Sequence, residues 1–300
     1  MGGFARGLLK LLVGLVALVA IALGAVYSLS GQRLARTYAV EVPPLTIPTD
    51  AAAVERGRHI YQTRGCADCH GEDLSGNVVA DDPLIGRLSG PNLTRGEGGV
   101  GAELTDDDYV RAIVYGIGPD GRGLRIMPSE DYVKMGAADL GALIAYLKQA
   151  PPVDKVPPPT VFRPLGHALV LKGDLMPSAS RVDLSAGYAE APPEGPTAEY
   201  GDYLANTCRG CHGPTLSGGK IPGAPPDWPA AKNLTPDPAT GLGQWTEADF
   251  FRAIREQTRP DGTKLDPVMP AQQFARMTDD ELKALWAYLL TIEAKPVGNR

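Results

Sequence analysis

The chain has 300 residues, which suggests about two domains, and its composition is that of an ordinary globular protein apart from 36 glycines and 28 prolines. This excess indicates long loops and linkers rather than a strand-rich core. The net charge is −6 and no basic tract stands out, so the sequence gives no support to nucleic-acid binding, while its mild acidity suits a partner with a basic docking face.

The N-terminus contains a run of nineteen residues without a charge, from Leu11 to Leu29. An apolar stretch of about twenty residues spans a bilayer as a helix. Small residues at 28–30 offer a possible cleavage site, so a signal peptide is the alternative, but the run exceeds the apolar core of about 7–15 residues that signal peptides have. We therefore expect residues 1–30 to form a cytoplasmic N-terminus and a single transmembrane anchor.

Proline-rich segments divide the rest of the chain. Residues 31–50 are predicted to be an extended, semi-rigid tether. A globular unit is expected over residues 51–150 and a second unit with the C-terminal tail over residues 197–300. Residues 151–196 between them are predicted to be an ordered but irregular linker.

The two units are an internal repeat. Identical short segments recur at an offset of 141 or 142 positions: Leu-Ser-Gly from 74 and 216, Asn-Leu-Thr from 92 and 233, Pro-Asp-Gly from 119 and 260, Met-Pro from 127 and 269, and Ala-Tyr-Leu from 145 and 287. A repeat of this length indicates domain duplication rather than a solenoid.

Each unit contains the same helix signals. Thr105 and Thr246 are predicted N-caps, each followed three residues later by an aspartate and flanked by apolar residues placed for a hydrophobic staple. Each unit also ends in an amphipathic pattern with apolar residues at i, i+3, i+4 and i+7. Shorter helices are expected near residues 54–62 and 198–205, each closed by the cysteine motif that follows. Strand signals are sparse, so the sequence predicts a mainly α protein.

All four cysteines lie in two copies of C-x-x-C-H, at residues 66–70 and 208–212. This motif is the attachment signature of a c-type haem. Two thiols add to the two vinyl groups of one porphyrin, and the next histidine reaches the iron as its proximal ligand. We therefore expect two covalently bound haem c groups. The predicted attachment and ligand residues are Cys66, Cys69 and His70 for one haem and Cys208, Cys211 and His212 for the other.

Three other interpretations of the cysteines fit less well. A redox dithiol needs no histidine after it and is typical of a βαβ pattern, which is absent here. Zinc ribbons also pair C-x-x-C motifs, but their pairs are separated by tens of residues, not by 142 positions. Structural disulfides would not need a histidine after each pair.

Each haem iron has a sixth coordination position, which methionine, histidine, water or nothing can fill. The two spare histidines are His59 and His167. Neither has a histidine at the equivalent place in the other unit, so we expect both to be packing or surface residues.

Methionines occur in two matched pairs. Met135 and Met277 immediately precede the last helix of each unit, where an apolar side chain serves as a staple. Met127 and Met269 lie in Gly/Pro-rich loops, each 57 positions after the motif histidine, and have no helix face to fill. A loop methionine of this kind is a good soft ligand for haem iron. We therefore predict Met127 and Met269 as the second axial ligands.

With these features each unit resembles a class I cytochrome c domain, which has a first helix leading into C-x-x-C-H, a Met-bearing loop and a final helix. The shared short segments also resemble the multihaem cytochrome c subunits of membrane-bound alcohol and sugar-acid dehydrogenases, which usually carry three haems. The resemblance implies two tandem class I cytochrome c domains behind the transmembrane helix. It further implies that the Pro91 carbonyl accepts a hydrogen bond from His70. The second unit has Lys232 at this place and lacks the proline, so the two haems need not share a potential.

The predicted function is that of a membrane-anchored dihaem cytochrome c that relays single electrons between redox partners of a respiratory or photosynthetic chain. It would act as a carrier or as an accessory subunit of a larger membrane oxidoreductase complex. The alternatives are the electron-accepting cytochrome subunit of a periplasmic dehydrogenase and a dihaem c-type enzyme.

An enzyme is disfavoured by the ligand set. A thiosulfate-oxidising dihaem enzyme would use a fifth cysteine, and a dihaem peroxidase would leave one iron open, whereas this chain has four cysteines and a symmetric methionine pair. We expect no small-molecule substrate. Because c-type haem is attached outside the cytoplasm, the haem units are expected on the periplasmic or outer face of the cytoplasmic membrane.

Overall fold

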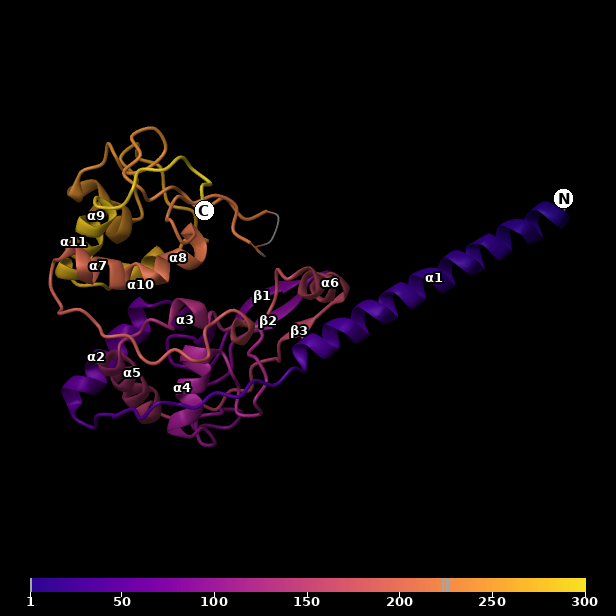
Figure 1. The fold of residues 1–300 in the computed structure, drawn as a ribbon, viewed down its shortest axis with the longest axis horizontal. Helices are drawn as coiled ribbons and strands as arrows, with labels where there is room; N and C mark the ends of the chain where they lie inside the picture. The colour runs from indigo at the N-terminus through magenta and orange to yellow at the C-terminus, as the bar shows by residue number, and fades with distance from the viewer. Residues whose placement is uncertain (1, 223, 225–226) are drawn as a thin grey trace.

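The computed structural model describes residues 2–222, 224 and 227–300. A single long helix, α1 (Gly2–Leu34), projects from a body of two lobes (Figure 1). Its apolar side chains are exposed along most of its length, and the helix is long and apolar enough to cross a membrane. The predicted N-terminal apolar helix is therefore confirmed as a helix.

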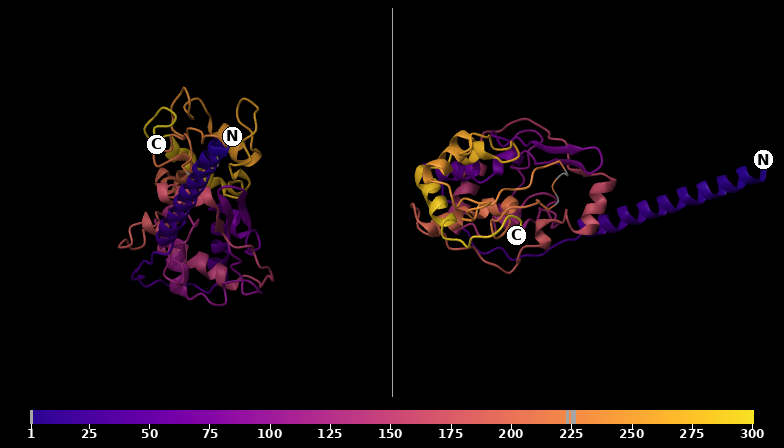
Figure 2. Two further views of the ribbon diagram at one scale, coloured as in Figure 1. Left: turned by 90° about the vertical axis from the view of Figure 1, so that its right-hand side faces the viewer. Right: turned by 90° about the horizontal axis from the view of Figure 1, so that it is seen from above.

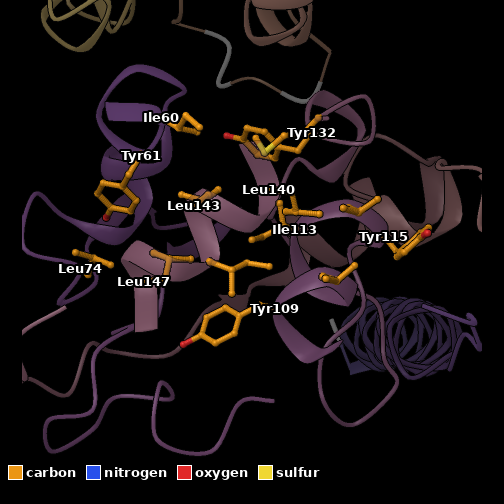
Figure 3. Packing of buried hydrophobic residues seen from close by; sticks show 14 of the residues in the cluster. Ile60, Tyr61, Leu74, Tyr109, Ile113, Tyr115, Tyr132, Leu140, Leu143 and Leu147 are labelled. Carbon is orange, nitrogen blue, oxygen red and sulfur yellow. The ribbon is translucent and has the colours of Figure 1, made fainter. Parts of the chain in front are cut away.

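The first lobe contains the first repeat. Its elements are α2 (Ala51–Thr63), α3 (Cys66–His70), β1 (Val78–Asp82), β2 (Gly86–Ser89), α4 (Asp106–Tyr115), the short 3-10 helix η1 (Ser129–Asp131) and α5 (Ala137–Gln149). Its core lies between α2, α4 and α5, where side chains such as Ile60, Tyr109 and Leu143 converge (Figure 3). The core of this lobe is thus built mainly from helix faces.

The second lobe repeats the helical part of this plan. Its elements are α7 (Ala198–Leu204), α8 (Asn206–His212), α9 (Glu247–Glu256), the short α10 (Ala271–Phe274) and α11 (Asp279–Leu289). Its core is formed by apolar residues such as Leu204, Phe250 and Leu282. Both lobes therefore have the mainly helical architecture that the sequence predicts.

In each lobe the first helix crosses the last helix at a glycine. A β-carbon at Gly57 on α2 would collide with the Ala142 carbonyl oxygen on α5, and one at Gly201 on α7 would collide with that of Ala284 on α11. Only a residue without a side chain allows the two backbones to approach this closely. These crossings fix the frame from which each cysteine motif continues.

The predicted helix caps at Thr105 and Thr246 are confirmed, and Thr278 forms a third cap of the same kind. Thr105, Thr246 and Thr278 each accept a hydrogen bond from the backbone three residues later, and that residue's carboxylate bonds back to the threonine N–H. One expectation about the motif is wrong, because it forms separate short helices (α3, and part of α8) rather than closing the preceding helix. Gly65 adopts a left-handed φ of 82° between α2 and α3 and breaks the helix there.

The linker is more regular than expected. Its residues Val161–Phe162 form β3, which pairs antiparallel with β2 to complete a three-stranded sheet in the order β1-β2-β3. Helix α6 (Pro164–Lys172) follows, with its proline at the first turn, and the 3-10 helix η2 (Ser178–Ser180) comes after it. Helix α6 contacts α1, and Figure 1 and the right view of Figure 2 show it beside the end of α1 that joins the body.

The tether after α1 runs along the first lobe. Tyr38 donates its backbone N–H to the Gly121 carbonyl at 2.8 Å, and the Tyr188 hydroxyl donates to the Pro43 carbonyl at 2.7 Å. Apolar tether side chains such as Val42 pack against the core of the first lobe. The tether is therefore held on the protein surface.

The glycine at the second helix crossing is expected to be essential for stability. Replacing Gly201 with Ala should lower the free energy of unfolding of the second lobe by about 1–3 kcal/mol, because the added methyl group forces α7 and α11 apart. Guanidinium denaturation followed by circular dichroism measures the loss. Gly187→Ala is the control, because its β-carbon would meet nothing within 4 Å. Equal stability of the two variants would contradict the close crossing.

Candidate haem sites

The first lobe encloses a cavity of about 530 Å³ that brings the predicted site residues together. Cys66, Cys69 and His70 from α3 line it, and so does Met127 from the loop before η1. Most of the remaining wall is apolar, from side chains such as Leu143 on α5. An apolar wall with two thiols, a histidine and a methionine suits a planar apolar ligand that carries a central metal.

The backbone holds His70 in a defined tautomer. Its Nδ1 donates a hydrogen bond to the Pro91 carbonyl oxygen at 3.1 Å, which leaves Nε2 free to bind a metal. Burial lowers the pKa of His70 and thereby favours the neutral ring that a metal requires, although the bond to Pro91 opposes this shift. The local geometry therefore prepares the histidine for coordination.

Two buried hydroxyl groups at the first cavity also suit a haem. The side-chain oxygens of Ser89 and Tyr109 have no hydrogen-bond partner among the described residues, and both residues line the cavity. A buried polar atom without a partner is costly and calls for a ligand or water. Haem carries two propionates, which accept hydrogen bonds. The first cavity therefore fits haem in its thiols, its histidine, its apolar wall and its hydroxyls.

The second lobe contains an equivalent cavity of about 440 Å³. Cys211 and His212 from α8 line it together with Met269, and Cys208 packs against the core beside them. His212 Nδ1 donates to the Lys232 carbonyl oxygen at 2.7 Å. The missing proline therefore does not remove the hydrogen-bond acceptor, since the acceptor is a backbone carbonyl that any residue supplies. This corrects the expected difference between the two histidines.

The other methionine pair lies away from both cavities. Met135 and Met277 are buried in the cores of their lobes, with 8% and 2% of their surface exposed. Their positions agree with a structural role before α5 and α11.

The two spare histidines pack as expected and line neither cavity. His59 Nε2 lies 2.8 Å from a carboxylate oxygen of Glu281 in the other lobe. His167, on α6, packs against the ring of Tyr27 on α1. Both are thus packing residues rather than ligands in this structure.

The lobes meet through two equivalent contacts between their cysteine motifs and the segments after their methionine loops. Gln273 on α10 donates its side-chain amide to the carboxylate of Asp68 in the first motif. The equivalent contact in the other direction joins Asp131 on η1 to Gly210 in the second motif. Asp131 lies so close to Gly210 that a β-carbon on Gly210 would collide with its carboxylate. A contact repeated with its partners exchanged defines a pseudo-twofold interface.

A second exchanged pair reinforces this symmetry. Tyr203 on α7 donates its hydroxyl to Asp139 on α5 at 2.6 Å, and His59 on α2 bonds to Glu281 on α11. Asp139 and Glu281 occupy equivalent positions of the repeat. Sequence reasoning missed all of these contacts, because a repeat shows which positions correspond but not which ones touch across an interface.

The comparisons with known proteins agree with the site geometry. The family model described as Cytochrome c matches residues 54–151 and 198–293. The cytochrome c subunit of alcohol dehydrogenase (quinone) from Gluconacetobacter polyoxogenes is 38% identical over 131 residues, covering 41% of this chain and 28% of that protein. The fructose dehydrogenase cytochrome subunit from Gluconobacter japonicus is 38% identical over 109 residues, covering 34% and 22%. A diheme cytochrome c-type protein from Cereibacter sphaeroides is 29% identical over 99 residues, covering 30% and 33%.

Asp131 is the carboxylate that faces the second motif in the first exchanged pair of contacts. Burial raises its pKa to about 7, the neighbouring Glu130 carboxylate adds to this shift, and the Arg181 guanidinium opposes it. The folded state therefore binds a proton more tightly at Asp131 than the unfolded chain does. By linkage, this contribution to stability is complete below the unfolded pKa near 4 and is lost as the pH rises to about 7.

Asp131→Asn is expected to remove this pH dependence, since asparagine cannot ionise. The variant should be more stable than the parent by about 1–3 kcal/mol at pH 8 and should show little gain at pH 4, because each pKa unit corresponds to about 1.4 kcal/mol before solvent screening. Guanidinium titrations between pH 4 and 8 measure the difference. Glu190→Gln, an exposed carboxylate in the linker, is the control. A gain that is the same at both pH values would show that Asp131 does not titrate in this range.

Proposed function

The chain belongs to the cytochrome c family, and from this premise we propose that it is a membrane-anchored dihaem cytochrome that relays single electrons between redox partners. It carries two covalently bound haem c groups, one for each cytochrome c domain. Haem supplies reversible one-electron chemistry at its iron. The chain has to bury the two haem groups, supply the axial ligands of their irons and hold the two groups near each other.

The observation that carries the proposal is the pseudo-twofold interface. The two haem-attachment motifs both lie at this interface, where Asp68 meets Gln273 and Gly210 meets Asp131. A relay requires its two redox groups to be close and fixed, and these contacts bind the attachment helix of each lobe to the methionine segment of the other. The arrangement supports transfer within one chain.

For the irons we propose His70 with Met127 and His212 with Met269 as the axial ligands. Met127 shares its cavity with His70, and Met269 shares its cavity with His212. Ligation by histidine and a thioether raises the reduction potential of haem. Cys66, Cys69, Cys208 and Cys211 are the proposed attachment residues, in agreement with the spacing of the motif.

We also propose that α1 anchors the protein in the cytoplasmic membrane as a single pass, with the haem domains on the periplasmic or outer face. The length and apolar surface of α1 support a membrane span, and the uncharged run leaves Arg6 and Lys10 before it and Arg33 after it. Covalent haem attachment outside the cytoplasm supports the orientation.

A second candidate is an electron-accepting subunit of a periplasmic dehydrogenase complex. The cytochrome subunits of the alcohol and fructose dehydrogenases named above favour this possibility, although the chain covers about a quarter of their length. In either case we propose protein redox partners rather than a small-molecule substrate.

The ligand assignment predicts distinct outcomes for the two methionine pairs. Met127→His and Met269→His should each keep the haem attached but lower its potential by part of the ~0.8 V range that axial ligands span, because a second imidazole favours ferric iron more than a thioether does. Met135→Leu and Met277→Leu are matched controls that should leave the spectra unchanged. The near-infrared charge-transfer band of ferric His/Met haem, read for each variant, measures the result. Loss of this band in the controls would reverse the assignment.

The relay itself is tested by injecting one electron into the oxidised full-length protein by pulse radiolysis. A transfer between the haems should follow, at a rate that does not depend on protein concentration, and it should be absent after Cys208→Ala and Cys211→Ala remove the second haem. A rate proportional to concentration would mean that electrons pass only between molecules. Carbon monoxide binding to a ferrous haem of the parent protein would instead favour an enzyme with an open iron.

A further inference from the structure

Helix α6 of the linker is fixed to the last two turns of α1. The His167 ring lies 4.2 Å from the Tyr27 ring, and its Nδ1 is hydrogen-bonded to the Ser30 hydroxyl at 2.7 Å. Ser30 is fully buried, whereas most of the apolar residues before it on α1 are exposed. The contact is therefore a packed joint and not a chance approach of two helices.

An arginine completes the joint. The Arg33 guanidinium donates hydrogen bonds to the carbonyl oxygens of Val170 and Leu171, at 3.2 and 2.7 Å. Carbonyl groups in the last turn of a helix have no partner within the helix, so a cation there supplies missing bonds and offsets the helix dipole. The end of α6 is thereby held at Arg33, immediately beyond the uncharged part of α1.

The position of this joint along α1 sets its depth in a bilayer. About twenty helical residues cross the hydrocarbon core, and the uncharged run begins at Leu11. Helix α1 would then leave the hydrocarbon core of the bilayer at about Ser30. Tyr27 lies near this boundary, where membrane proteins concentrate tyrosine and tryptophan. Because α6 contacts Tyr27, Ser30 and Arg33, it lies at the level of the lipid headgroups.

The surface beside this joint exposes large apolar side chains. Leu165 on α6 is 42% exposed and Leu84 in the β1–β2 turn is 62% exposed. They are neighbours, since the Leu165 N–H donates to the Leu84 carbonyl oxygen at 3.1 Å. Figures 1 and 2 place α6 and the β1–β2 hairpin at the end of the body from which α1 departs. Both leucines therefore belong to the part of the body nearest the bilayer.

A groove of about 470 Å³ lies between α1 and α6 at the same level. Leu29 and Leu171 give it an apolar side, and Arg33, Arg36 and Gln32 give it a cationic and hydrogen-bonding side. An acyl chain suits the first side and a phosphate suits the second, since guanidinium groups bind phosphate oxygens strongly.

We propose that α6, the β1–β2 turn and this groove form a membrane foot that rests on the outer leaflet and binds the phosphate of a phospholipid. The proposal rests on the membrane anchoring by α1 that is proposed above. The foot adds a second, interfacial contact to the span. Together the membrane span and the foot fix the tilt of the haem domains relative to the membrane, whereas the span alone would leave this tilt free.

Spin labels test the position of the foot in the full-length holoprotein, whose native cysteines are occupied by haem. Single cysteines replace Leu165 and Leu84, with Leu18→Cys in the middle of α1 and Leu290→Cys in the second lobe as references. In nanodiscs, power saturation with oxygen and with a water-soluble nickel chelate should place the labels at 165 and 84 at headgroup depth. The label at 290 should report water and the label at 18 should report lipid.

The outcomes separate the foot from the anchor. If the label at 18 reports lipid while those at 165 and 84 match the label at 290, the foot is absent and the anchor stands. If the label at 18 also reports water, the proposed anchoring itself is wrong.

Native mass spectrometry tests the groove with phosphatidylglycerol as the probe. The parent protein should retain a bound lipid in detergent, and Arg36→Gln should retain several-fold less. Lys283→Gln, a change of the same kind at an exposed site in the second lobe, should behave as the parent does. Equal retention by all three proteins would overturn the lipid site, and displacement of the lipid by millimolar inorganic phosphate would reduce it to a site for a free anion.

Discussion

Each haem domain depends on a direct backbone contact between its first and last helices. Gly57 and Gly201 remove the side chain that would hold these helices apart, at Ala142 and Ala284. Because the cysteine motif follows the first helix within a few residues, the crossing determines where the thiols and the histidine begin. In the first lobe the cavity then forms between the motif, the last helix and the methionine loop. The lack of a side chain at this glycine thus controls the geometry of the haem site, although the glycine does not line the cavity.

The pseudo-twofold interface turns two similar domains into one unit with unequal halves. The contacts are equivalent in position but not in chemistry, since Asp131 faces the second motif where Gln273 faces the first. The same holds for Tyr203 with Asp139 and His59 with Glu281. In a homodimer both halves of such an interface must carry the same residues, whereas a fused pair is free to carry different residues at equivalent positions.

Local signals in the sequence predicted the parts of the fold that local physics determines. The threonine caps and the staple methionines follow from spacing within about ten residues. The repeat needs no structure either, since identical segments recur 141 or 142 positions apart. The structure adds what depends on distant partners. Strand β3 has two residues and forms only through its pairing with β2. Helix α6 is short and is held by the end of α1. No short window of sequence contains both members of these contacts.

The linker has one effect that the symmetry of the repeat conceals. Its residues Pro159 and Thr160 form part of the first cavity wall, where Thr160 is hydrogen-bonded to Ser89 and accepts a bond from Arg125. Among the residues that the structure describes, those that line the second cavity all belong to the second domain. The linker therefore contributes to the wall of the first haem site but not to that of the second. A change in this part of the linker would then alter the surroundings of one haem and leave those of the other as they are.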